Sequence, residues 1–215
     1  MIDVKNVYKS YNVDGKINHV LHNISIQFPT HENIGILGLN GAGKSTLLRM
    51  IAGIEMPDSG TVKSTGRISW PIGFKGGFNS SLSGEENCRF VARIFNEDVD
   101  QVVGYTQDFA ELGKHFFMPI GTYSSGMKAR LAFGLSMAID FDMYLVDEVI
   151  AVGDNIFKKK CKRVFRDRQD HSAIIMVSHN INTIKEYCTK CAILTSGSMR
   201  MFNNIDMAAK VYKAL

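Results

Sequence analysis

A glycine-rich segment, GLNGAGKS at residues 38–45, is the part of this 215-residue chain whose residue types and spacing most clearly suggest chemistry. It fits the pattern G-x-x-x-x-G-K-[S/T] at every specified position. Glycines let backbone N–H groups turn toward phosphates, a lysine ammonium reaches the β- and γ-phosphates, and a serine hydroxyl binds Mg²⁺. The sequence therefore predicts a nucleoside triphosphate site. The residues that we expect to bind the nucleotide here are Gly38, Leu39, Asn40, Gly41, Ala42, Gly43, Lys44, Ser45 and Thr46, with Ser45 also a ligand for Mg²⁺.

A second candidate lies further along the chain, where an apolar run at residues 143–146 ends in Asp147 and Glu148. Ligands of parallel sheets sit at the carboxyl ends of the strands, so acids at this place suit a site beside a phosphate loop. We expect Asp147 to hold Mg²⁺ through water and Glu148 to orient or deprotonate an attacking water. Taken alone, the two residues are equally typical of solvated acids at the start of a loop; the phosphate loop favours the catalytic interpretation.

A third candidate is the segment YSSGM at residues 123–127, which stands just before a helical pattern. One interpretation is an ordinary helix start, with Ser124 or Ser125 as the cap and Gly126 allowing close approach. The other is that the helix start and a serine hydroxyl point at a phosphate. The residues by themselves leave both open.

Strands and helices alternate along the chain around these segments. Apolar patterns typical of strands occur at residues 2–7, 21–28, 33–37, 143–146, 173–177 and 191–195. Patterns typical of helices occur at 45–54, 84–95, 99–112 and 126–139, around the basic residues 158–160, and at the C-terminus. The order predicts an α/β fold with a core of mainly parallel strands, an N-terminal antiparallel β part and a helical insert at about 72–139. Since no repeat or linker is evident, we expect a single domain over 1–215.

Composition excludes several classes of protein. Hydrophobic residues make up 45% and charged residues 21%, which is typical of a globular chain. No apolar run approaches the roughly 20 residues of a membrane-spanning helix, and the first residues lack the apolar core of a signal peptide, so we expect a cytosolic chain. A net charge of +4 is too weak and scattered to argue for nucleic-acid binding. We interpret the four cysteines as buried thiols, and Cys188 and Cys191 as too isolated a pair for a metal site.

The order of these motifs resembles the ATP-binding subunit of ABC transporters: a phosphate loop, a helical insert with Ser-Ser-Gly, a strand ending in Asp-Glu, and then Val-Ser-His at 177–179. The resemblance implies a P-loop NTPase of the ABC-ATPase type, with ATP and Mg²⁺ as cofactors. It implies that Tyr11 stacks on adenine and that His179 contacts the γ-phosphate. It makes 151–154 the D-loop.

The same resemblance makes residues 123–127 a divergent signature motif, in which Ser124, Ser125 and Gly126 contact ATP bound to a second copy of the chain. Serine replaces the usual glycine at its third position and methionine the usual glutamine at its end. A further departure lies at 70–78, where the family normally carries a glutamine that contacts Mg²⁺ and this chain has none. The metal contact and the coupling route through that loop must therefore differ here.

The segments ISWPIGFKGGF, SLSGEEN and YLVDEVIAVGD are similar to ATP-binding proteins of capsular-polysaccharide exporters in Gram-negative bacteria. This similarity implies an ATPase that drives capsular-polysaccharide export as a homodimer with ATP at its interface, on the cytoplasmic face of the inner membrane. The partners it implies are a polytopic inner-membrane permease and periplasmic and outer-membrane export proteins. We expect the permease to dock near 70–78, where Phe74 and Phe78 are expected to be exposed.

Three alternatives remain at this point. The first is an ATPase of another polysaccharide exporter, of the O-antigen or teichoic acid type. The second is an ABC-type ATPase that is not part of a transporter, although such proteins usually carry two ATPase units or long insertions. The third is a P-loop kinase, which needs no Ser-Ser-Gly signature.

Overall fold

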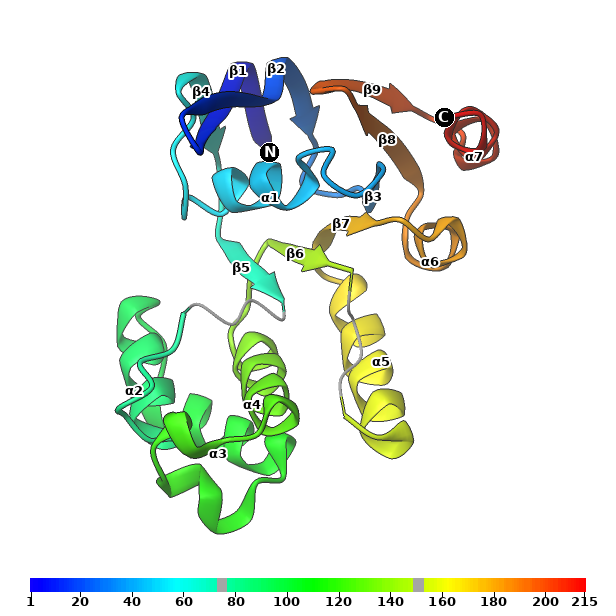
Figure 1. Ribbon diagram of the computed structural model, residues 1–215. Coiled ribbons are helices and arrows are strands. Elements are labelled where there is room, and N and C mark those ends of the chain that lie inside the picture. Colours follow the sequence, from blue (N-terminus) through cyan, green and yellow to red (C-terminus); the bar gives the residue numbers. More distant parts are fainter. Residues whose placement is uncertain (73–76, 149–152) are drawn as a thin grey trace. The chain divides into compact units, whose positions relative to one another are not determined.

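The computed structural model describes residues 1–72, 77–148 and 153–215, and the chain divides into two compact units, which are described separately below (Figure 1). Unit 1 comprises Met1–Pro71, Phe141–Glu148 and Ser172–Leu215. Unit 2 comprises Ile72–Asp140 and Val149–His171. Unit 2 thus begins where the helical insert is expected to begin, but it also includes a segment beyond the predicted end of that insert.

Unit 1 contains two sheets. The smaller sheet is antiparallel, with strand order β2-β1-β4. Its strands are β1 (Ile2–Val13), β2 (Lys16–Phe28) and β4 (Ser59–Ser64). The larger sheet has the order β5-β6-β7-β3-β8-β9. Its strands are β3 (Ile34–Leu37), β5 (Ile68–Ile72), β6 (Met143–Asp147), β7 (Ala173–Ser178), β8 (Lys190–Thr195) and β9 (Ser198–Phe202).

The centre of the larger sheet is parallel. Strand β7 pairs with β6 on one side and with β3 on the other, and β3 also pairs with β8. In this register Leu37 lies opposite Ser178, and Asp147 lies opposite Val177. The carboxyl ends of β6, β7 and β3 therefore meet at one edge of the sheet. The predicted α/β class, with a parallel core and an antiparallel N-terminal part, is confirmed.

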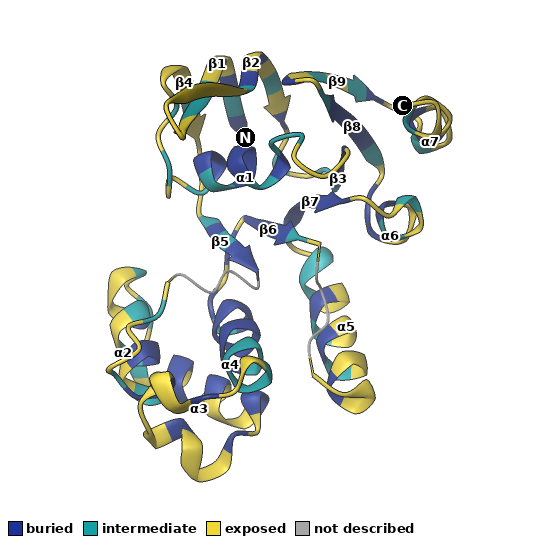
Figure 2. Cartoon of the chain, in the orientation of Figure 1, coloured by how far each residue is buried: buried dark blue, intermediate teal, exposed yellow. Residues whose placement is uncertain are grey.

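Helix α1 (Lys44–Ile51) packs against both sheets of unit 1. Its buried residues Leu47, Leu48 and Ile51 join one hydrophobic cluster with side chains of β1, β2, β3, β6 and β7. Strands β3 and β7 are buried along their whole length, as the short apolar runs predict (Figure 2). The apolar stripe of α1 thus fixes the helix between the sheets, and with it the loop that precedes the helix.

Unit 2 is helical. Its helices are α2 (Gly84–Ile94), α3 (Val99–Ala110), α4 (Ser125–Ala138) and α5 (Asn155–Gln169), with short 3₁₀ turns at Gly113–Phe117 and Ile120–Thr122. Helix α2 begins with a capping box: the Ser83 side chain accepts from the backbone of Glu86, and the Glu86 carboxylate accepts from the backbone of Ser83. Such reciprocal caps satisfy two N–H groups that the helix itself cannot pair.

Aromatic side chains hold three helices of unit 2 together. The Phe109 ring of α3 lies 5.6 Å from that of Phe133 on α4 and 5.4 Å from that of Phe157 on α5. The Lys160 ammonium lies 4.6 Å from the centre of the Phe109 ring and 2.6 Å from a carboxylate oxygen of Glu111. These contacts explain why α5, which lies outside the predicted insert, belongs to the helical unit.

Several elements differ from the sequence-based expectation. Strands β4, β5 and β9 and helix α6 (Ile181–Tyr187) were not predicted, whereas the C-terminal helix α7 (Ile205–Lys213) was. Strand β4, SGTVKS, is mostly exposed and carries little apolar signal. Helix α1 ends at Ile51 rather than at 54, and Gly53 beyond it has φ +71°, a conformation that glycine adopts at helix ends.

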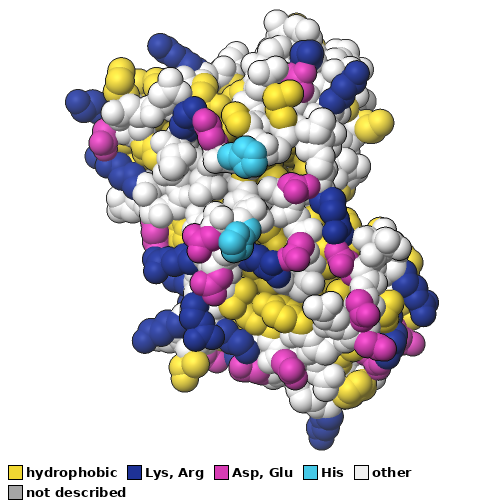
Figure 3. Space-filling model, turned by 180° about the vertical axis from the view of Figure 1, so that it is seen from behind, with side chains coloured by type: hydrophobic (Ala, Val, Ile, Leu, Met, Phe, Trp, Pro, Cys, Tyr) yellow, Lys and Arg dark blue, Asp and Glu magenta, His cyan; other side chains and the backbone are white. Residues whose placement is uncertain are grey.

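Among the described residues, no helix is both long enough and apolar enough to cross a lipid bilayer. Basic and acidic side chains lie beside one another over much of the face that Figure 3 shows. The small positive excess of +4 is therefore not collected into one uniform patch on that face.

Replacing Ser69 tests the attachment of β5 to β6, the strand that ends in the candidate catalytic acids. The buried Ser69 hydroxyl accepts from the Leu145 N–H at 2.9 Å and donates to the Trp70 carbonyl at 2.8 Å. We expect Ser69→Ala to lower the free energy of unfolding by about 1–3 kcal/mol, because a buried N–H loses its acceptor. Urea denaturation measures this. The control is Ser64→Ala, which replaces an exposed serine on β4. Equal losses of unfolding free energy in the two variants would show that the Ser69 hydroxyl does not attach β5 to β6.

Candidate functional site

The glycine-rich loop connects β3 to α1, and two of its glycines are needed for its shape. Gly41 and Gly43 have φ of +81° and +97°, which side chains rarely tolerate. A Cβ on Gly43 would also lie 2.7 Å from Val20 Cγ1 and 2.9 Å from Leu21 Cδ2. The loop therefore packs directly on β2 and leaves no room for a larger residue at this point.

Lys44 lies inside the loop that precedes it. Its side chain is buried, and its Nζ donates to the carbonyl oxygens of Gly38 at 2.8 Å and Leu39 at 3.0 Å. Gly38 is itself confined, since an added Cβ would lie 2.5 Å from the Leu194 carbonyl oxygen. The loop thus surrounds the Lys44 ammonium.

The other predicted nucleotide-binding residues differ in exposure. Thr46 is buried, Ala42, Gly43 and Ser45 are half-buried, and Leu39, Asn40 and Gly41 are exposed.

The acid pair stands where β6 ends. Asp147 is the last residue of the strand, and Glu148 follows it with φ +60°, a conformation unusual for a residue with a side chain. The Glu148 N–H donates to the Val177 carbonyl at 2.9 Å, so pairing with β7 continues past the strand end while the chain turns. Non-glycine residues held in this region often belong to functional sites. The turn places the Glu148 side chain at the sheet edge.

Glu148 and His179 contact each other. The Glu148 Oε1 lies 2.7 Å from the His179 Nδ1, and 40% and 62% of the two side chains are exposed. An ionised carboxylate only accepts, so the Nδ1 carries the proton in this contact and Nε2 remains for another partner. The sequence names both residues as catalytic candidates, and the structure pairs them directly.

The sheet order brings these groups to one edge. His179 follows β7, which lies between β6, with Asp147 and Glu148 at its end, and β3, which leads into the glycine-rich loop. This edge therefore collects the glycine-rich loop, the Lys44 ammonium, two carboxylates and an imidazole. The Ser45 hydroxyl and the Asp147 carboxylate are oxygen donors of the kind that Mg²⁺ prefers, so the residues present fit that ion.

Tyr11, expected to stack on adenine, is half-buried on β1 and linked to α1. Its hydroxyl donates to Glu55 Oε1 at 2.6 Å and accepts from the Arg49 guanidinium at 3.1 Å. Arg49 and Glu55 were not predicted from the sequence, because neither belongs to a recognised motif and neither is close to Tyr11 along the chain. Only the fold brings the three together.

The segment with Ser124 and Gly126 forms the exposed start of α4, in unit 2. Ser124 is the N-cap, and its hydroxyl accepts from the Met127 N–H at 3.2 Å. Tyr123 before it is buried and donates to the His115 carbonyl at 2.6 Å. Ser124 and Ser125 are exposed and Gly126 is half-buried. The capping interpretation thus holds for Ser124, and a role toward a phosphate stays a prediction.

Two predicted segments lie partly outside the described residues. Ala151 and Val152 of the predicted D-loop are not described; Asp154 is the N-cap of α5 and pairs with Arg130 at 2.7 Å. In the segment 70–78, the expected docking residue Phe74 also lies outside the described residues. Phe78 is half-buried rather than exposed, which corrects that expectation.

All four cysteines are free and buried. Burial raises the pKa of the Cys88 thiol to about 12, and burial likewise raises the pKa values of Cys188 and Cys191. The described residues include no group of three His, Cys, Asp or Glu side chains that could hold a metal ion. The thiols of Cys88, Cys188 and Cys191 are therefore protonated at neutral pH.

Comparison with known proteins gives full-length matches. Residues 21–151 match the family described as ABC transporter. The chain is 50% identical to the capsule polysaccharide export ATP-binding protein CtrD of Neisseria meningitidis, over 100% of both chains. It is 49% identical to the polysialic acid transport ATP-binding protein KpsT of Escherichia coli, over 99% of both. It is 38% identical to the teichoic acids export ATP-binding protein TagH of Bacillus anthracis, over 89% of this chain and 36% of that protein.

Solved structures share the fold at low sequence identity. The ATP-binding subunit of an ABC transporter superposes with a TM-score of 0.81 at 20% identity, covering 98% of this chain and 93% of the other. A dimeric ATP-binding cassette in a post-hydrolysis state bound to ADP and Pi gives 0.78 at 20% identity, covering 94% and 98%. The likeness concerns the fold of the chain.

Replacing Gly43 tests the packing of the loop on β2. We expect Gly43→Ala to weaken ATP binding at least about tenfold and to lower the stability of the chain, because the new Cβ displaces the loop from Val20 and Leu21. Isothermal titration with ATP and thermal unfolding measure the two effects.

Gly15→Ala provides the matched control for Gly43→Ala. Gly15 has a similar φ of +78° in the turn between β1 and β2, and an added Cβ there meets nothing within 4 Å. This control should lose about 1 kcal/mol of stability from backbone strain and keep its affinity for ATP. Unchanged affinity in Gly43→Ala would contradict the role of the close packing.

Proposed function

This chain belongs to the ABC transporter family, and we propose that it is the ATP-hydrolysing subunit of an exporter that moves capsular polysaccharide across the inner membrane. The observation that carries the proposal is 50% identity, along the whole length of both chains, with a capsule polysaccharide export ATP-binding protein. The sheet edge that joins a phosphate loop to Glu148 and His179 supports the ATPase activity.

Teichoic acid export is the second candidate for the transported polymer. The relatives with that description are 33–38% identical, and the match to the Bacillus anthracis protein covers 36% of its length. The capsule and polysialic acid relatives are 46–50% identical and match at nearly full length. Both the identity and the coverage favour capsular polysaccharide.

The loop around Lys44 binds the triphosphate of ATP. Backbone N–H groups of the loop and the amino end of α1 point positive charge at the phosphates. The Lys44 ammonium exchanges its bonds to the Gly38 and Leu39 carbonyls for phosphate oxygens. The Ser45 hydroxyl, and the Asp147 carboxylate through water, would hold Mg²⁺, and the ion would offset negative charge on the phosphates.

Glu148 and His179 act on the attacking water and the γ-phosphate. The Glu148 carboxylate accepts a hydrogen bond from the water and takes its proton as the water oxygen attacks the γ-phosphorus. The bond between that phosphorus and the oxygen bridging to the β-phosphate breaks, and ADP is the leaving group. His179 keeps the carboxylate oriented through its Nδ1, and its Nε2 is left to contact the γ-phosphate. The 2.7 Å contact between Glu148 Oε1 and His179 Nδ1 supports this division of roles, because Glu148 Oε2 and His179 Nε2 take no part in it.

The working unit is a head-to-tail dimer. The exposed start of α4 offers unpaired N–H groups and the Ser125 hydroxyl, with Gly126 leaving space for a phosphate. Supplied by the second copy, these groups stabilise charge on the γ-phosphate, an effect worth about 10³–10⁵ in rate where it has been measured for other phosphoryl transfers. ATP thus joins the two copies, and its hydrolysis separates them.

Export also requires partners that cross lipid. The similarity to capsule polysaccharide export ATP-binding proteins supports an ATPase that works at the cytoplasmic face of the inner membrane, bound to a polytopic permease. Periplasmic and outer-membrane export proteins carry the polymer onward. Closure of the ATP-bound dimer moves the permease because the two states contact it differently.

Glu148→Gln should bind ATP, stop hydrolysing it and accumulate as an ATP-bound dimer. The amide oxygen still accepts from His179, while the base needed for water attack is lost. Size-exclusion chromatography with ATP and Mg²⁺ and a phosphate-release assay measure both effects. Lys44→Ala, the comparison variant, should bind no ATP and stay monomeric. A Glu148→Gln protein that remains monomeric with ATP would rule out the dimer or the role of Glu148.

In cells, the substrate assignment predicts retention of polymer. A strain whose own gene carries Glu148→Gln should synthesise capsular polysaccharide and keep it inside, whereas a strain with the wild-type gene displays it. Antibody labelling of intact and permeabilised cells separates surface polymer from internal polymer. A normal surface capsule in the mutant strain would contradict the assignment of capsular polysaccharide as the transported polymer. The assignment of ATPase activity would not be affected.

A further inference from the structure

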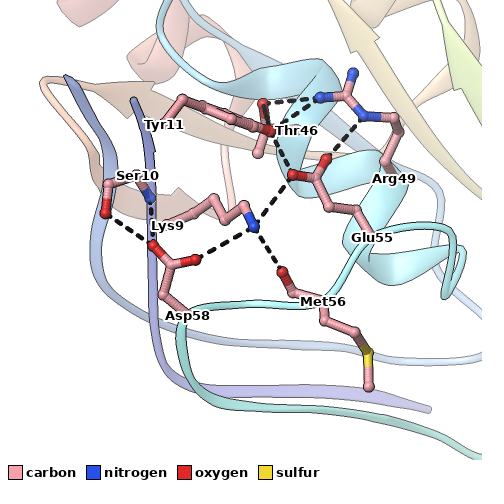
Figure 4. Close-up of polar contacts among 8 residues, drawn as sticks. All are labelled: Lys9, Ser10, Tyr11, Thr46, Arg49, Glu55, Met56 and Asp58. Atoms are coloured by element: carbon pink, nitrogen blue, oxygen red, sulfur yellow. Dashed lines mark hydrogen bonds and ion pairs between the residues drawn. The ribbon is translucent and has the colours of Figure 1, made fainter. Parts of the chain in front are cut away.

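A half-buried polar network joins the two ends of the candidate nucleotide site (Figure 4). Tyr11 comes from β1, at the end expected to meet adenine. Thr46 and Arg49 come from α1, the helix that follows the phosphate loop, and Glu55 comes from the turn after that helix. These four side chains, named here the tyrosine clamp, lie within unit 1.

Every polar atom at the centre of the tyrosine clamp has a partner. The Tyr11 hydroxyl donates its one proton to Glu55 Oε1 at 2.6 Å and accepts from Arg49 Nη2 at 3.1 Å. Arg49 Nε donates to Glu55 Oε2 at 3.0 Å. The Thr46 hydroxyl lies 3.3 Å from both the Tyr11 hydroxyl and the Arg49 guanidinium. The hydroxyl of Tyr11 is therefore fixed from several directions at the surface of α1.

The charges in the tyrosine clamp keep it in this arrangement at neutral pH. Burial disfavours an ionised Glu55, but hydrogen bonds from Tyr11, Arg49 and Lys9 outweigh burial and keep the pKa of Glu55 below its ordinary value. Lys9 Nζ lies 3.3 Å from Glu55 Oε1 and 5.4 Å from the centre of the Tyr11 ring. An anionic Glu55 thus accepts from the tyrosine hydroxyl and holds two cations near it.

We propose that Glu55 and Arg49 are positioning residues for the nucleotide base: they hold the Tyr11 hydroxyl against α1 and so set the place of the Tyr11 ring relative to the phosphate loop. This inference rests on the proposed ATP site. The hydroxyl oxygen stands at the far end of the tyrosine ring, so hydrogen bonds to it fix the direction of the ring's long axis and hold the side chain in one χ1 rotamer. The tie to α1 gives the ring and the phosphate loop a common support, which lowers the entropy lost when a base stacks on the ring.

The test compares a ligand that has a base with one that lacks it. The probes are the non-hydrolysable ATP analogue AMP-PNP and inorganic tripolyphosphate, each with Mg²⁺, titrated into the full-length chain. Tyr11→Phe and Glu55→Ala should raise the Kd for AMP-PNP about fivefold, the effect of one lost hydrogen bond, and leave the Kd for tripolyphosphate unchanged. Glu55→Gln, which keeps an acceptor, should recover part of the loss.

Asp58→Asn is the matched control. Asp58 belongs to the same surface and bonds to Ser10 and Lys9, but it has no bond to the Tyr11 hydroxyl. Its affinity for AMP-PNP should equal that of the wild type. Thermal unfolding without ligand shows whether each variant is folded. If Glu55→Ala does not fold, Tyr11→Phe still tests the proposal, because it removes only one oxygen atom.

A double variant separates positioning from direct contact with the ligand. If Glu55 acts through Tyr11, Glu55→Ala adds little to the loss already caused by Tyr11→Phe; if it touches the nucleotide itself, the two losses multiply. Wild-type affinity in Glu55→Ala and Tyr11→Phe, multiplied losses, or equal losses for both probes would overturn the positioning role. Failure of the wild-type chain to bind either probe would instead overturn the ATP site, and the inference with it.

Discussion

Helix α1 is held between the two sheets of unit 1 by Leu47, Leu48 and Ile51, so packing alone fixes where its amino end points. Interiors are packed as densely as organic crystals, and a helix buried on this much of its surface does not shift without opening cavities. The phosphate loop inherits that position from the helix that it precedes. On its other side the loop rests on β2, where the missing side chain of Gly43 allows contact. The direction of the amino end of α1 is thus set by Leu47, Leu48 and Ile51, which are buried in the hydrophobic cluster.

The positions of Glu148 and His179, at the carboxyl ends of the parallel strands, depend on the same larger sheet through backbone hydrogen bonds rather than through apolar packing. Glu148 lies just beyond β6 with an unusual φ of +60°, and its N–H bond to Val177 keeps it attached to β7. A conformation of this kind costs about 1–3 kcal/mol and persists only where neighbouring structure determines it. Here the neighbour is the strand that also carries His179. The carboxylate and the imidazole therefore meet because of backbone pairing, and their 2.7 Å contact then fixes which nitrogen carries the proton.

The parts of this architecture that follow from local chemistry could be predicted from the sequence. The glycine-rich loop, the acid pair and the buried strands can each be predicted from a pattern of a few consecutive residues. The order of these patterns along the chain predicts both the family and the α/β class. Strand β4 could not be predicted, because it is an exposed edge strand whose only strong reason to be extended is its pairing with β1. Helix α5 presents a basic sequence, and its place in unit 2 depends on Phe157 meeting Phe109, a contact that no local pattern reveals. Arg49 and Glu55 are hidden for the same reason.

The tyrosine clamp also shows why stability alone does not account for the charged residues around Tyr11. Glu55 and Arg49 keep 19% and 32% of their side chains exposed, and ion pairs in such settings contribute little net free energy to folding, because desolvation offsets much of the attraction. What the hydrogen bond from Arg49 Nε to Glu55 Oε2 supplies reliably is a fixed direction for the two side chains. In the proposed site, the loop at 38–45 holds the triphosphate through backbone groups that any nucleoside triphosphate satisfies, so it cannot by itself fix the base. A side-chain network anchored on the same helix can, and it ties recognition of the base to the element that binds the phosphates.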